Sequence, residues 1–571
     1  MQGRGSFEEY LVSQGVVDDS RLSDARAESS RSGASILETL VAVGGLKSED
    51  LYRSLAAFCG LRYVLPSRME IPQDLVRLVP ARFATHYNCV PVEDRNGVLV
   101  VAVSDPSNNQ LLDDIRLALK QRIEPVVAPP EDIARAIKKV YGVGAETVER
   151  ILVENDGVAP LVNLEKTPAG SDLGDERIDA SIIKFVNELL SEAIQWNATD
   201  VHIEPYENEL RVRYRVDGVL RSVPVPPSIR NFHAAIVSRI KVMANLNIAE
   251  KRLPQDGKIR AKLGDEQFDL RVSILPTPHG ETVNLRILNR ASMFFTLEQL
   301  GFLPEDLEIF EQFIRRPHGM ILVTGPTGSG KTTTLYAALD KLNRIEHKIV
   351  TIEDPIEYQL QGVTQMQVAP QIGFDFSNAL RSMLRHDPDI MLVGEIRDYE
   401  TAEMAIRAGL TGHLVFSTLH TNDAAGAVTR LIDLGVEPFL IASTMIASIA
   451  QRLVRCVCPH CAEEYEPDEV LLRELGADEH EVRQSRFRRG RGCDQCRHTG
   501  FRGRTAIYEV LPFTAPIRTL TVDRAPSTLI RRKACELGMR TLRQCGWRRV
   551  CQGHTTIEEV LRITADADLN D

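Results

Sequence analysis

The pattern of apolar and polar residues divides the chain into blocks with different periods. From residue 301 onward, short apolar runs that predict buried strands alternate with stretches of helical periodicity. The runs are contained in GMILVTG, KIVTIED, DIMLVGE and HLVFSTLH, and each precedes a predicted helix. This alternation is typical of a parallel sheet covered by helices, so we expect residues 301–455 to form an α/β core.

Residues 176–300 show a different pattern. An amphipathic helical stretch comes first, and ELRVRYRVDGVLRSV then alternates with period two around Asp217 and Gly218, a pair typical of hairpin turns. A further helix and further strands follow. We therefore expect an α+β domain here, with a boundary near residue 300, where the strand pattern changes from antiparallel to parallel.

Residues 1–145 contain a short internal repeat. Apolar and glycine positions recur at a constant offset, with Leu11, Val12, Gly15 and Leu22 returning as Leu40, Val41, Gly44 and Leu51. The repeat predicts two similar helical hairpins, and the mixed pattern after them predicts an N-terminal α/β domain. Residues 146–175 are irregular and contain Gly, Pro and acidic residues, so we expect a flexible linker.

One octapeptide, GPTGSGKT, lies between a predicted strand and the helical sequence TTTLYAALDKL. Its glycines let backbone N–H groups surround phosphate oxygens, Lys331 can neutralise the phosphate charge, and the Thr332 hydroxyl can hold Mg²⁺. The alternative is a tight turn that binds no nucleotide. The flanking strand and helix favour ATP as the ligand, bound by Gly325, Pro326, Thr327, Gly328, Ser329, Gly330, Lys331, Thr332 and Thr333.

Acidic residues follow two other predicted strands, at the edge where an open α/β sheet binds its ligand. Glu395 follows the apolar run 390–393 and can reach Mg²⁺ or its water. In TIEDPIEY one of Glu353, Asp354 and Glu357 can orient or deprotonate the attacking water. Such residues are often only helix caps, but their common placement favours functional roles for Glu395 and Glu357.

Two histidines flank the strand in HLVFSTLH. A lone histidine is usually an ordinary surface or core residue, but His413 or His420 can also sense the γ-phosphate of a bound nucleotide. The position of His420 at the end of the strand favours His420 for this role.

Arginines recur along the strands of the 176–300 block. Arg211, Arg213 and Arg215 share one face of a predicted strand, and Arg271 and Arg286 lie on the polar faces of two others. These side chains form either a solvated sheet face or contacts to a transferring phosphate, supplied from another domain or subunit. The residues alone leave both interpretations open for Arg215, Arg271 and Arg286.

Four of the ten cysteines form two pairs with metal-ligand spacing, Cys458 with Cys461 and Cys493 with Cys496. Two such pairs allow four thiolates to bind Zn²⁺ tetrahedrally. The alternative is four reduced thiols without a metal. Four protein ligands leave no open position on the ion, so we expect a structural zinc module at residues 456–503 and not a catalytic metal.

Length and charge restrict the remaining classes of function. At 571 residues the chain should hold about three to four domains. No apolar stretch approaches the roughly 18 residues of a membrane span and no signal peptide is evident, so we expect a cytoplasmic protein. The net charge of −11 disfavours a nucleic-acid-binding protein, and we expect no nucleic acid partner.

One basic segment stands out in this acidic chain. It is either a solvated face or a surface for an anionic partner, such as anionic phospholipid headgroups or an acidic cytoplasmic loop. Its members are Arg483, Arg486, Arg488, Arg489, Arg491, Arg497, Arg502 and Arg504.

The ordered set GPTGSGKTTTLY, TIEDPIEY, LRHDPDIMLVGEIRD and TGHLVFSTLHTNDAAGAVTRL resembles the secretion, or traffic, ATPases, and in particular the type II secretion ATPase family. The resemblance also takes in AEKRLPQDGKIR and the cysteine pairs and covers about residues 178–565. It implies a RecA-like P-loop core, a preceding PAS-like domain and a C-terminal helical region at 504–571. It also implies catalytic roles for Lys331, Glu357, Glu395 and His420. Because it places arginines of the preceding domain near the nucleotide, it favours phosphate contact for Arg215, Arg271 and Arg286.

Members of this family are hexameric motors. The resemblance therefore implies a homo-hexameric ATP hydrolase that drives pseudopilus assembly and protein export, peripherally attached to the inner membrane. A type IV pilus assembly ATPase shares these motifs and is the first alternative, although GAVTRL and the spacing of the cysteine pairs favour type II secretion. The second is a slow nucleotide-gated switch or scaffold, which partner-stimulated turnover would exclude.

The N-terminal block faintly resembles the N-terminal domains of this family, some of which bind cyclic-di-GMP through an RLGxxL pattern. In this chain the matching stretches are Ser6–Leu11 and Ser35–Leu40, which carry neither the Arg nor the Gly. Without that arginine the ligand has no bidentate partner. We therefore expect residues 1–145 to dock on the cytoplasmic domain of an inner-membrane secretion component and not to bind cyclic-di-GMP.

Overall fold

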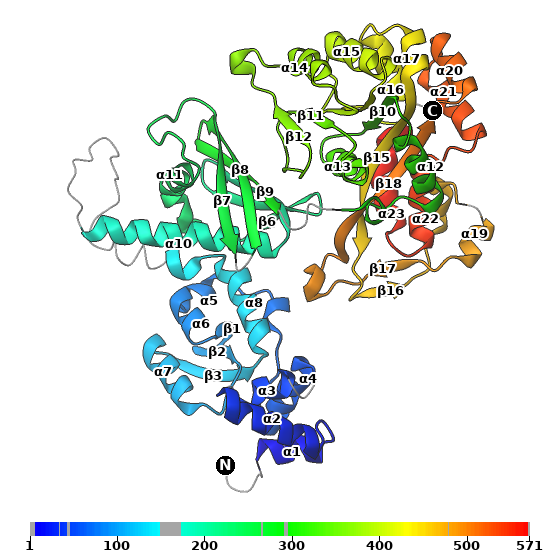
Figure 1. Ribbon diagram of the computed structural model, residues 1–571. Helices are drawn as coiled ribbons and strands as arrows, with labels where there is room; N and C mark the ends of the chain where they lie inside the picture. Colours follow the sequence, from blue (N-terminus) through cyan, green and yellow to red (C-terminus); the bar gives the residue numbers. More distant parts are fainter. Residues whose placement is uncertain are drawn as a thin grey trace. The chain divides into compact units, whose positions relative to one another are not determined.

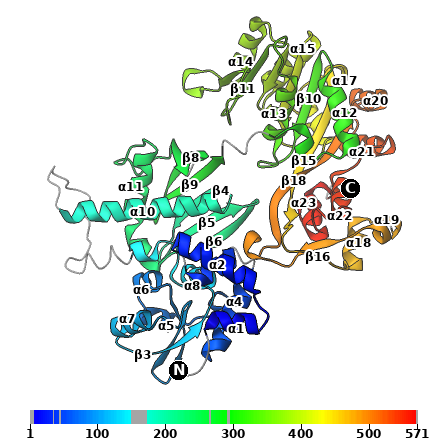
Figure 2. The ribbon, with the colours of Figure 1, turned by 60° about the horizontal axis from the view of Figure 1, so that its bottom comes forward.

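The computed structural model describes residues 6–33, 35–42, 46–148, 173–263, 266–289, 295–477 and 479–568. The chain divides into two compact units, Met1–Leu288 and Asn289–Asp571. Figures 1 and 2 show their elements from two directions. Among the helices of these described ranges, none is long and apolar enough to cross a membrane.

The first unit begins with the two predicted helical hairpins. Leu11, Leu22, Leu40 and Leu51 are all buried in one cluster, which confirms the repeat. Ser6 caps the first hairpin, because its Oγ accepts from the Glu9 N–H at 3.3 Å. Ser35 makes the corresponding bond to Glu38 at 3.3 Å. The helices are α1 (Phe7–Ser13), α2 (Asp19–Ser32), α3 (Ile36–Ala42) and α4 (Ser48–Cys59).

A three-stranded sheet with order β1-β2-β3 follows, and it confirms the mixed α/β prediction for the N-terminal block. Its middle strand is buried along almost its whole length, as expected for VLVVAV. The strands are β1 (Val90–Arg95), β2 (Val98–Val103) and β3 (Arg122–Val127). The helices are α5 (Gln73–Leu78), α6 (Ala81–His86), α7 (Asn109–Leu119) and α8 (Pro130–Tyr141).

The last part of the first unit is a six-stranded sheet with order β6-β5-β4-β9-β8-β7 and helices α10 (Leu173–Gln195) and α11 (His233–Met243). Apolar residues of both helices and of alternate strand positions form one core, which leaves the other strand positions for a polar face. Most of the predicted linker, residues 149–172, lies outside the described residues. The strands are β4 (Ala198–Pro205), β5 (Leu210–Val216), β6 (Val219–Val223), β7 (Gln255–Leu263), β8 (Glu266–Thr277) and β9 (Gly280–Asn289).

The second unit is built on a seven-stranded sheet with order β12-β11-β13-β14-β10-β15-β18. Its first six strands are parallel, which confirms the α/β prediction, and β18 pairs antiparallel with β15 at the edge. The strands are β10 (Gly319–Thr324), β11 (Ile349–Glu353), β12 (Thr364–Gln367), β13 (Ile390–Val393), β14 (Leu414–Leu419), β15 (Met445–Val457) and β18 (Phe501–Pro512).

Strand β18 corrects the expectation of a helical region from residue 504. Its residues Ala506–Leu511 are all buried, so the segment lacks the alternation that marks a half-buried strand, and a short apolar run cannot be told from a buried helix by period alone. The predicted helical region begins only after Pro512 and, up to Asp568, consists of four helices. They are α20 (Ala515–Val522), α21 (Ser527–Glu536), α22 (Leu542–Cys551) and α23 (Ile557–Asp568).

Helices cover both faces of this sheet (Figure 1). Alternate residues of β10 point to opposite faces: Ile321 and Val323 pack with α12 and α13, whereas Met320 and Leu322 pack with α15 and α16. Buried on both faces, β10 has the continuous apolar sequence of a central parallel strand. The covering helices are α12 (Pro304–Ile314), α13 (Lys331–Leu342), α14 (Phe376–Met383), α15 (Tyr399–Leu410), α16 (Gly426–Asp433) and α17 (Pro438–Thr444).

A small cysteine-containing module lies between β15 and β18 in the sequence. It contains a two-stranded antiparallel sheet, in which Glu463 pairs with Arg489. Its elements are β16 (Ala462–Glu464), α18 (Glu469–Leu475), α19 (Glu479–Gln484) and β17 (Arg488–Gly490).

Candidate active site

The predicted phosphate loop connects the end of β10 to the start of α13. Gly325, Gly328 and Gly330 have φ values of 146°, 79° and 87°, which side chains rarely adopt. A Cβ atom on Gly325 would lie 2.6 Å from the Gln451 carbonyl oxygen, and one on Gly330 would lie 2.8 Å from Gln451 Nε2. The loop therefore needs glycine for its backbone conformation and for its close packing on β15.

Lys331 closes this loop from the first turn of α13. Its Nζ donates to the carbonyl oxygens of Gly325 at 2.8 Å and Pro326 at 3.1 Å, and the residue is only 9% exposed. Burial, together with the nearby Arg452 cation, lowers the pKa of Lys331 to about 8, although the Glu395 carboxylate opposes this shift. A bound phosphate would favour the charged amine, so this geometry fits an anionic ligand.

A second polar group in the loop also fits a phosphate ligand. The Ser329 hydroxyl is buried and has no hydrogen-bond partner among the described residues. Buried hydroxyls are normally paired, and an oxyanion in the loop would supply the partner. Thr332 and Thr333 are half-buried in the first turn of α13, and a role for Thr332 in holding Mg²⁺ stays a prediction.

The sheet brings Glu395 and His420 to the same edge as the phosphate loop. Thr324 at the end of β10 is in register with Leu419 at the end of β14, and Val393 at the end of β13 is in register with Ser417. His420 Nε2 lies 3.5 Å from Glu395 Oε2. Glu395 also raises the pKa of Lys331, so these three residues lie together.

Glu395 has a second partner that the sequence reasoning missed. Arg397 Nη2 lies 2.5 Å from Glu395 Oε1. Arg397 is part of the motif GEIRD, two residues after Glu395, and this proximity in sequence could have indicated the ion pair. The ion pair holds the carboxylate between a guanidinium and an imidazole.

The carboxylates of TIEDPIEY have different environments. Glu353 is buried and accepts hydrogen bonds from Thr351 Oγ1 at 2.6 Å, Gln365 Nε2 at 3.2 Å and the Tyr336 hydroxyl. Burial raises its pKa in spite of these bonds, and the Glu357 charge raises it further. Glu353 therefore has a structural role, whereas a catalytic role for the half-buried Glu357 stays a prediction.

The structure excludes His413 from phosphate sensing. His413 precedes β14, and its carbonyl oxygen accepts from the N–H of Gly319, the first residue of β10. It therefore lies at the edge opposite to the phosphate loop, which follows the last residue of β10. Its ring contacts the Ala408 carbonyl oxygen at 3.0 Å. A six-residue strand separates the two histidines, so they cannot share an edge.

The predicted arginines lie on the six-stranded sheet of the first unit. Asp200 on β4 is in register with Arg215 on β5 and Arg286 on β9, and it forms ion pairs with both, at 3.6 and 3.1 Å. Arg271 is half-buried on β8. Contact between these arginines and a nucleotide stays a prediction, because they belong to a different compact unit from the phosphate loop.

The four predicted zinc ligands converge. The sulfur atoms of Cys458, Cys461, Cys493 and Cys496 all lie within 4.8 Å of one another. Burial opposes ionisation of Cys496, but backbone N–H groups of Cys493 and Gly500 donate to its Sγ and lower its pKa to about 6. A thiolate is the form that binds a metal, so the cluster fits Zn²⁺ with four protein ligands.

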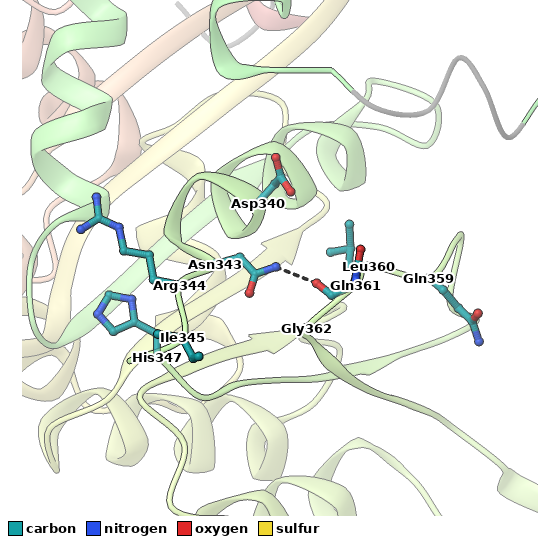
Figure 3. A pocket seen from close by; sticks show the side chains of 9 residues that line it. All are labelled: Asp340, Asn343, Arg344, Ile345, His347, Gln359, Leu360, Gln361 and Gly362. Atoms are coloured by element: carbon teal, nitrogen blue, oxygen red, sulfur yellow. Dashed lines mark hydrogen bonds between the residues drawn. The ribbon is translucent and has the colours of Figure 1, made fainter.

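Figure 3 shows a pocket of about 670 Å³ at the other end of α13, which contains none of the predicted site residues. Asn343 Nδ2 donates to the Gln361 carbonyl oxygen at 2.7 Å across it. Ile345 on its rim is 99% exposed. The pocket is a shallow surface hollow, and we assign it no ligand.

Two family models match the chain. The model described as type II/IV secretion system protein matches residues 175–562. The model described as MshEN domain matches residues 59–147. Together they account for the core, the six-stranded sheet and the three-stranded N-terminal sheet.

Curated relatives are similar over nearly the whole chain. The type IV pilus assembly ATPase PilB of Myxococcus xanthus is 42% identical over 564 residues, 98% of this chain and 99% of that protein. The type II secretion system protein E of Xanthomonas campestris pv. campestris is 42% identical over 568 residues, 98% of each. The crystal structure of the pilus retraction motor PilT with bound ADP covers 66% of this chain and 95% of that chain, at 26% identity and a TM-score of 0.44.

Proposed function

Because the chain belongs to the family of type II/IV secretion system proteins, we propose that it hydrolyses ATP and uses the energy to drive pseudopilus assembly and protein export in a type II secretion system. One observation carries the hydrolysis part of this proposal. Lys331, Glu395 and His420 come from three separate segments and meet at one edge of the sheet, beside a glycine loop with a buried, unpaired hydroxyl.

Each of these residues has a task in phosphoryl transfer. The phosphates of ATP replace the two carbonyl oxygens that Lys331 contacts, and the amine then neutralises the β- and γ-phosphates. Glu357 orients or deprotonates the attacking water. His420 contacts the γ-phosphate and transmits its loss to Glu395, 3.5 Å away. Mg²⁺ held by Thr332 and Glu395, directly or through water, would neutralise charge that develops on the phosphate oxygens.

The proposal includes a homo-hexamer in which the first unit closes on a nucleotide. Arg215, Arg271 and Arg286 then stabilise the charge of the transferring phosphate, in the same or a neighbouring subunit. Asp200 holds Arg215 and Arg286 on one sheet face, so both guanidinium groups are oriented before closure. Closure would convert binding energy into movement of a membrane-bound partner.

We further propose that the protein is cytoplasmic and attaches to the inner membrane through residues 1–145. The partner is the cytoplasmic domain of an inner-membrane secretion component, with anionic phospholipid as an additional contact of the basic segment. Several arginines of that segment already pair with acidic neighbours: Arg489 Nε lies 3.1 Å from Glu463 Oε1, and Arg486 lies 3.9 Å from Glu464. This pairing lowers the net charge available to a membrane.

The second candidate is a type IV pilus assembly ATPase, which the similarity to the Myxococcus xanthus protein favours. Deletion of the gene distinguishes the two functions. Loss of secreted proteins from the medium with intact surface pili supports type II secretion. Loss of pili with unchanged secretion supports the second candidate.

Phosphate release by Lys331→Ala tests the hydrolysis itself. Lys341 on the same helix provides a matched control, because it pairs with Glu298 and Glu311 at 2.8 and 2.6 Å and contributes to no site. We expect Lys331→Ala to lose at least about 100-fold in kcat, since the charge developing on the phosphates loses its cation. Lys341→Ala should keep its activity. Equal phosphate release by wild type and Lys331→Ala would contradict the proposal.

A further inference from the structure

We propose that Arg452 is a positioning residue for ATP hydrolysis, whose guanidinium group fixes the loop after His420 against the phosphate loop. The inference rests on the proposed hydrolysis. It concerns a residue outside the motifs that predicted the site.

The strand order places Arg452 at the nucleotide edge of the sheet. Strand β15 is the neighbour of β10, and Ala450 is in register with Thr324, the last residue of β10. The next residues of β15, Gln451 and Arg452, therefore extend beyond the strand end where the phosphate loop begins. A Cβ atom on Gly325 would lie 3.0 Å from Arg452 Nη1, so the guanidinium group lies against the first glycine of the loop.

Arg452 joins this position to the segment that follows His420. Its Nη1 donates to the Gln451 carbonyl oxygen at 3.1 Å, and its Nη2 donates to the Asn422 carbonyl oxygen at 2.8 Å. The residue is only 7% exposed. A buried guanidinium is costly to desolvate. Its planar fork fixes the directions of the bonds to two carbonyl groups, whereas the N–H groups of an ammonium rotate freely.

The segment that Arg452 holds is fixed at further points. Thr421 Oγ1 donates to the Asp423 carbonyl oxygen at 2.9 Å, and Glu509 Oε1 accepts from the Ala424 N–H at 2.9 Å. His420 lies immediately before this segment and is half-exposed, so its ring has little packing of its own. The bond between Arg452 and Asn422 therefore contributes to the position of His420 relative to Glu395.

Gln451 connects the same strand to the other end of the phosphate loop. Its Oε1 accepts from Thr334 Oγ1 on α13 at 2.8 Å, and its Nε2 lies beneath Gly330. The two residues of β15 thus contact the first and last glycines of the loop and, through Arg452, the histidine segment. A shift of β15 would therefore move both ends of the phosphate loop and the histidine segment together.

The test compares Arg452→Lys and Arg452→Gln with the same changes at Arg518. Arg518 is a matched control because it also bridges two carbonyl groups, Phe513 at 2.9 Å and Met445 at 3.0 Å, but at the opposite end of β15. The measurements are kcat, the Kd for ADP, the pH profile of kcat/KM and the melting temperature of the full-length protein.

We expect both Arg452 variants to lose at least about tenfold in kcat, because misplacement of a catalytic group by a fraction of an ångström has effects of this size. The Kd for ADP should change less than about threefold, since the phosphate loop and Lys331 remain. The Arg518 variants should keep kcat within about twofold.

The pH profile distinguishes the positioning role of Arg452 from the effect of its charge on Lys331. Lys331 is acted on by two charged groups, Glu395 from the segment after β13 and Arg452 from β15. Arg452→Gln removes a cation that lowers the Lys331 pKa, so an alkaline limb of kcat/KM that reports Lys331 should move to higher pH. Arg452→Lys keeps the charge, so its limb should stay in place while kcat still falls.

Three results would overturn the inference. The first is wild-type kcat in Arg452→Lys, and the second is a loss of kcat matched by an equal loss of ADP affinity. The third is a loss of kcat that the unfolded fraction of the variant at the assay temperature fully explains, because Arg452 then serves stability alone. If Arg452→Gln does not fold, Arg452→Lys decides the test. Wild-type protein without phosphate release would refute the proposed function instead.

Discussion

Replacement of Glu509 by Gln tests the energetics of the second unit through its pH dependence. Glu509 lies on β18, is 1% exposed, and accepts the Ala424 N–H at 2.9 Å. Burial raises its pKa from 4.5 to about 7, and the Asp423 charge adds to the shift, while backbone N–H groups of Ala424 and Leu542 and the Arg531 cation oppose it. The carboxyl group is therefore protonated in the folded state at pH values where it is ionised in the unfolded chain.

The sign and size of the effect follow from linkage. Between the two pKa values the folded state binds more protons than the unfolded state, so the contribution of Glu509 to stability is present below pH 4.5 and is lost as pH rises through about 7. Each pKa unit corresponds to about 1.4 kcal/mol. From pH 5 to pH 8 the wild type should thus lose about 2 to 3 kcal/mol at this site, a loss that Gln cannot show.

Differential scanning fluorimetry at the two pH values measures this difference. The gap in Tm between Glu509→Gln and wild type should shift in favour of the variant by about 5 °C from pH 5 to pH 8, since ~1 kcal/mol moves Tm by roughly 2 °C in a unit of this size. Its absolute value at one pH also contains the loss of one hydrogen bond, so the change in the gap is the informative quantity.

Glu559 supplies the matched control. It is also buried, but Arg562 and Arg455 bind its carboxylate and lower its pKa in spite of burial. Its stabilising effect is therefore already complete at pH 5, and Glu559→Gln should be destabilised similarly at both pH values. A pH-independent gap for Glu509→Gln would show that its carboxyl group does not remain protonated in the folded protein.

The remaining predictions concern the metal, the arginines and the N-terminal block. Cys458→Ser should lose bound zinc in elemental analysis while Cys535→Ser, outside the cluster, keeps it; wild-type protein without zinc would contradict the site. A mixture of Lys331→Ala and Arg271→Ala subunits should regain hydrolysis if Arg271 acts across a subunit boundary, because some sites then contain both groups, and strictly additive activity would remove this assignment. Calorimetry of the full chain should detect no cyclic-di-GMP binding, since Ser6 and Ser35 cap helices where an arginine would be needed; micromolar affinity would contradict this.

The parts of the site that lie in short local motifs could be predicted from the sequence. The glycines of the phosphate loop indicate by themselves that its backbone adopts conformations closed to other residues. Glu395 and His420 each follow a predicted strand, and the carboxyl ends of parallel strands meet at one edge of the sheet. The alternative that His413 senses phosphate is wrong, because His413 and His420 lie at opposite ends of one strand and only His420 is at the edge of the phosphate loop. Local patterns do not state which end of a strand faces the ligand until the strand directions are known.

Arg452 could not be predicted, because its position depends on sheet order. It follows the phosphate loop by more than a hundred residues, and only the pairing of β15 with β10 brings the two together. The same strand was hard to interpret from the sequence, since eight consecutive buried residues, Met445–Arg452, show no period. Contacts between segments that are distant in sequence are the part of a site that local patterns do not determine.

The pairing of β15 with β18 connects the nucleotide edge to the cysteine cluster. Cys458 directly follows β15, and its N–H donates to the Gly500 carbonyl oxygen just before β18 begins, at 2.9 Å. Arg452 is in register with Ile507 farther along the same pair of strands. A zinc ion on the four cysteines would therefore close the end of the hairpin that carries Arg452, by joining two segments that the long insertion between them would otherwise separate. Because register pairs continue beyond Arg452 to Ala447 and Pro512, removal of the metal should weaken the pairing most at Val457 and Phe501 and least at the phosphate loop. Loss of zinc is thus expected to loosen the cysteine module first, and to leave the position of Arg452, the phosphate loop and kcat largely unchanged.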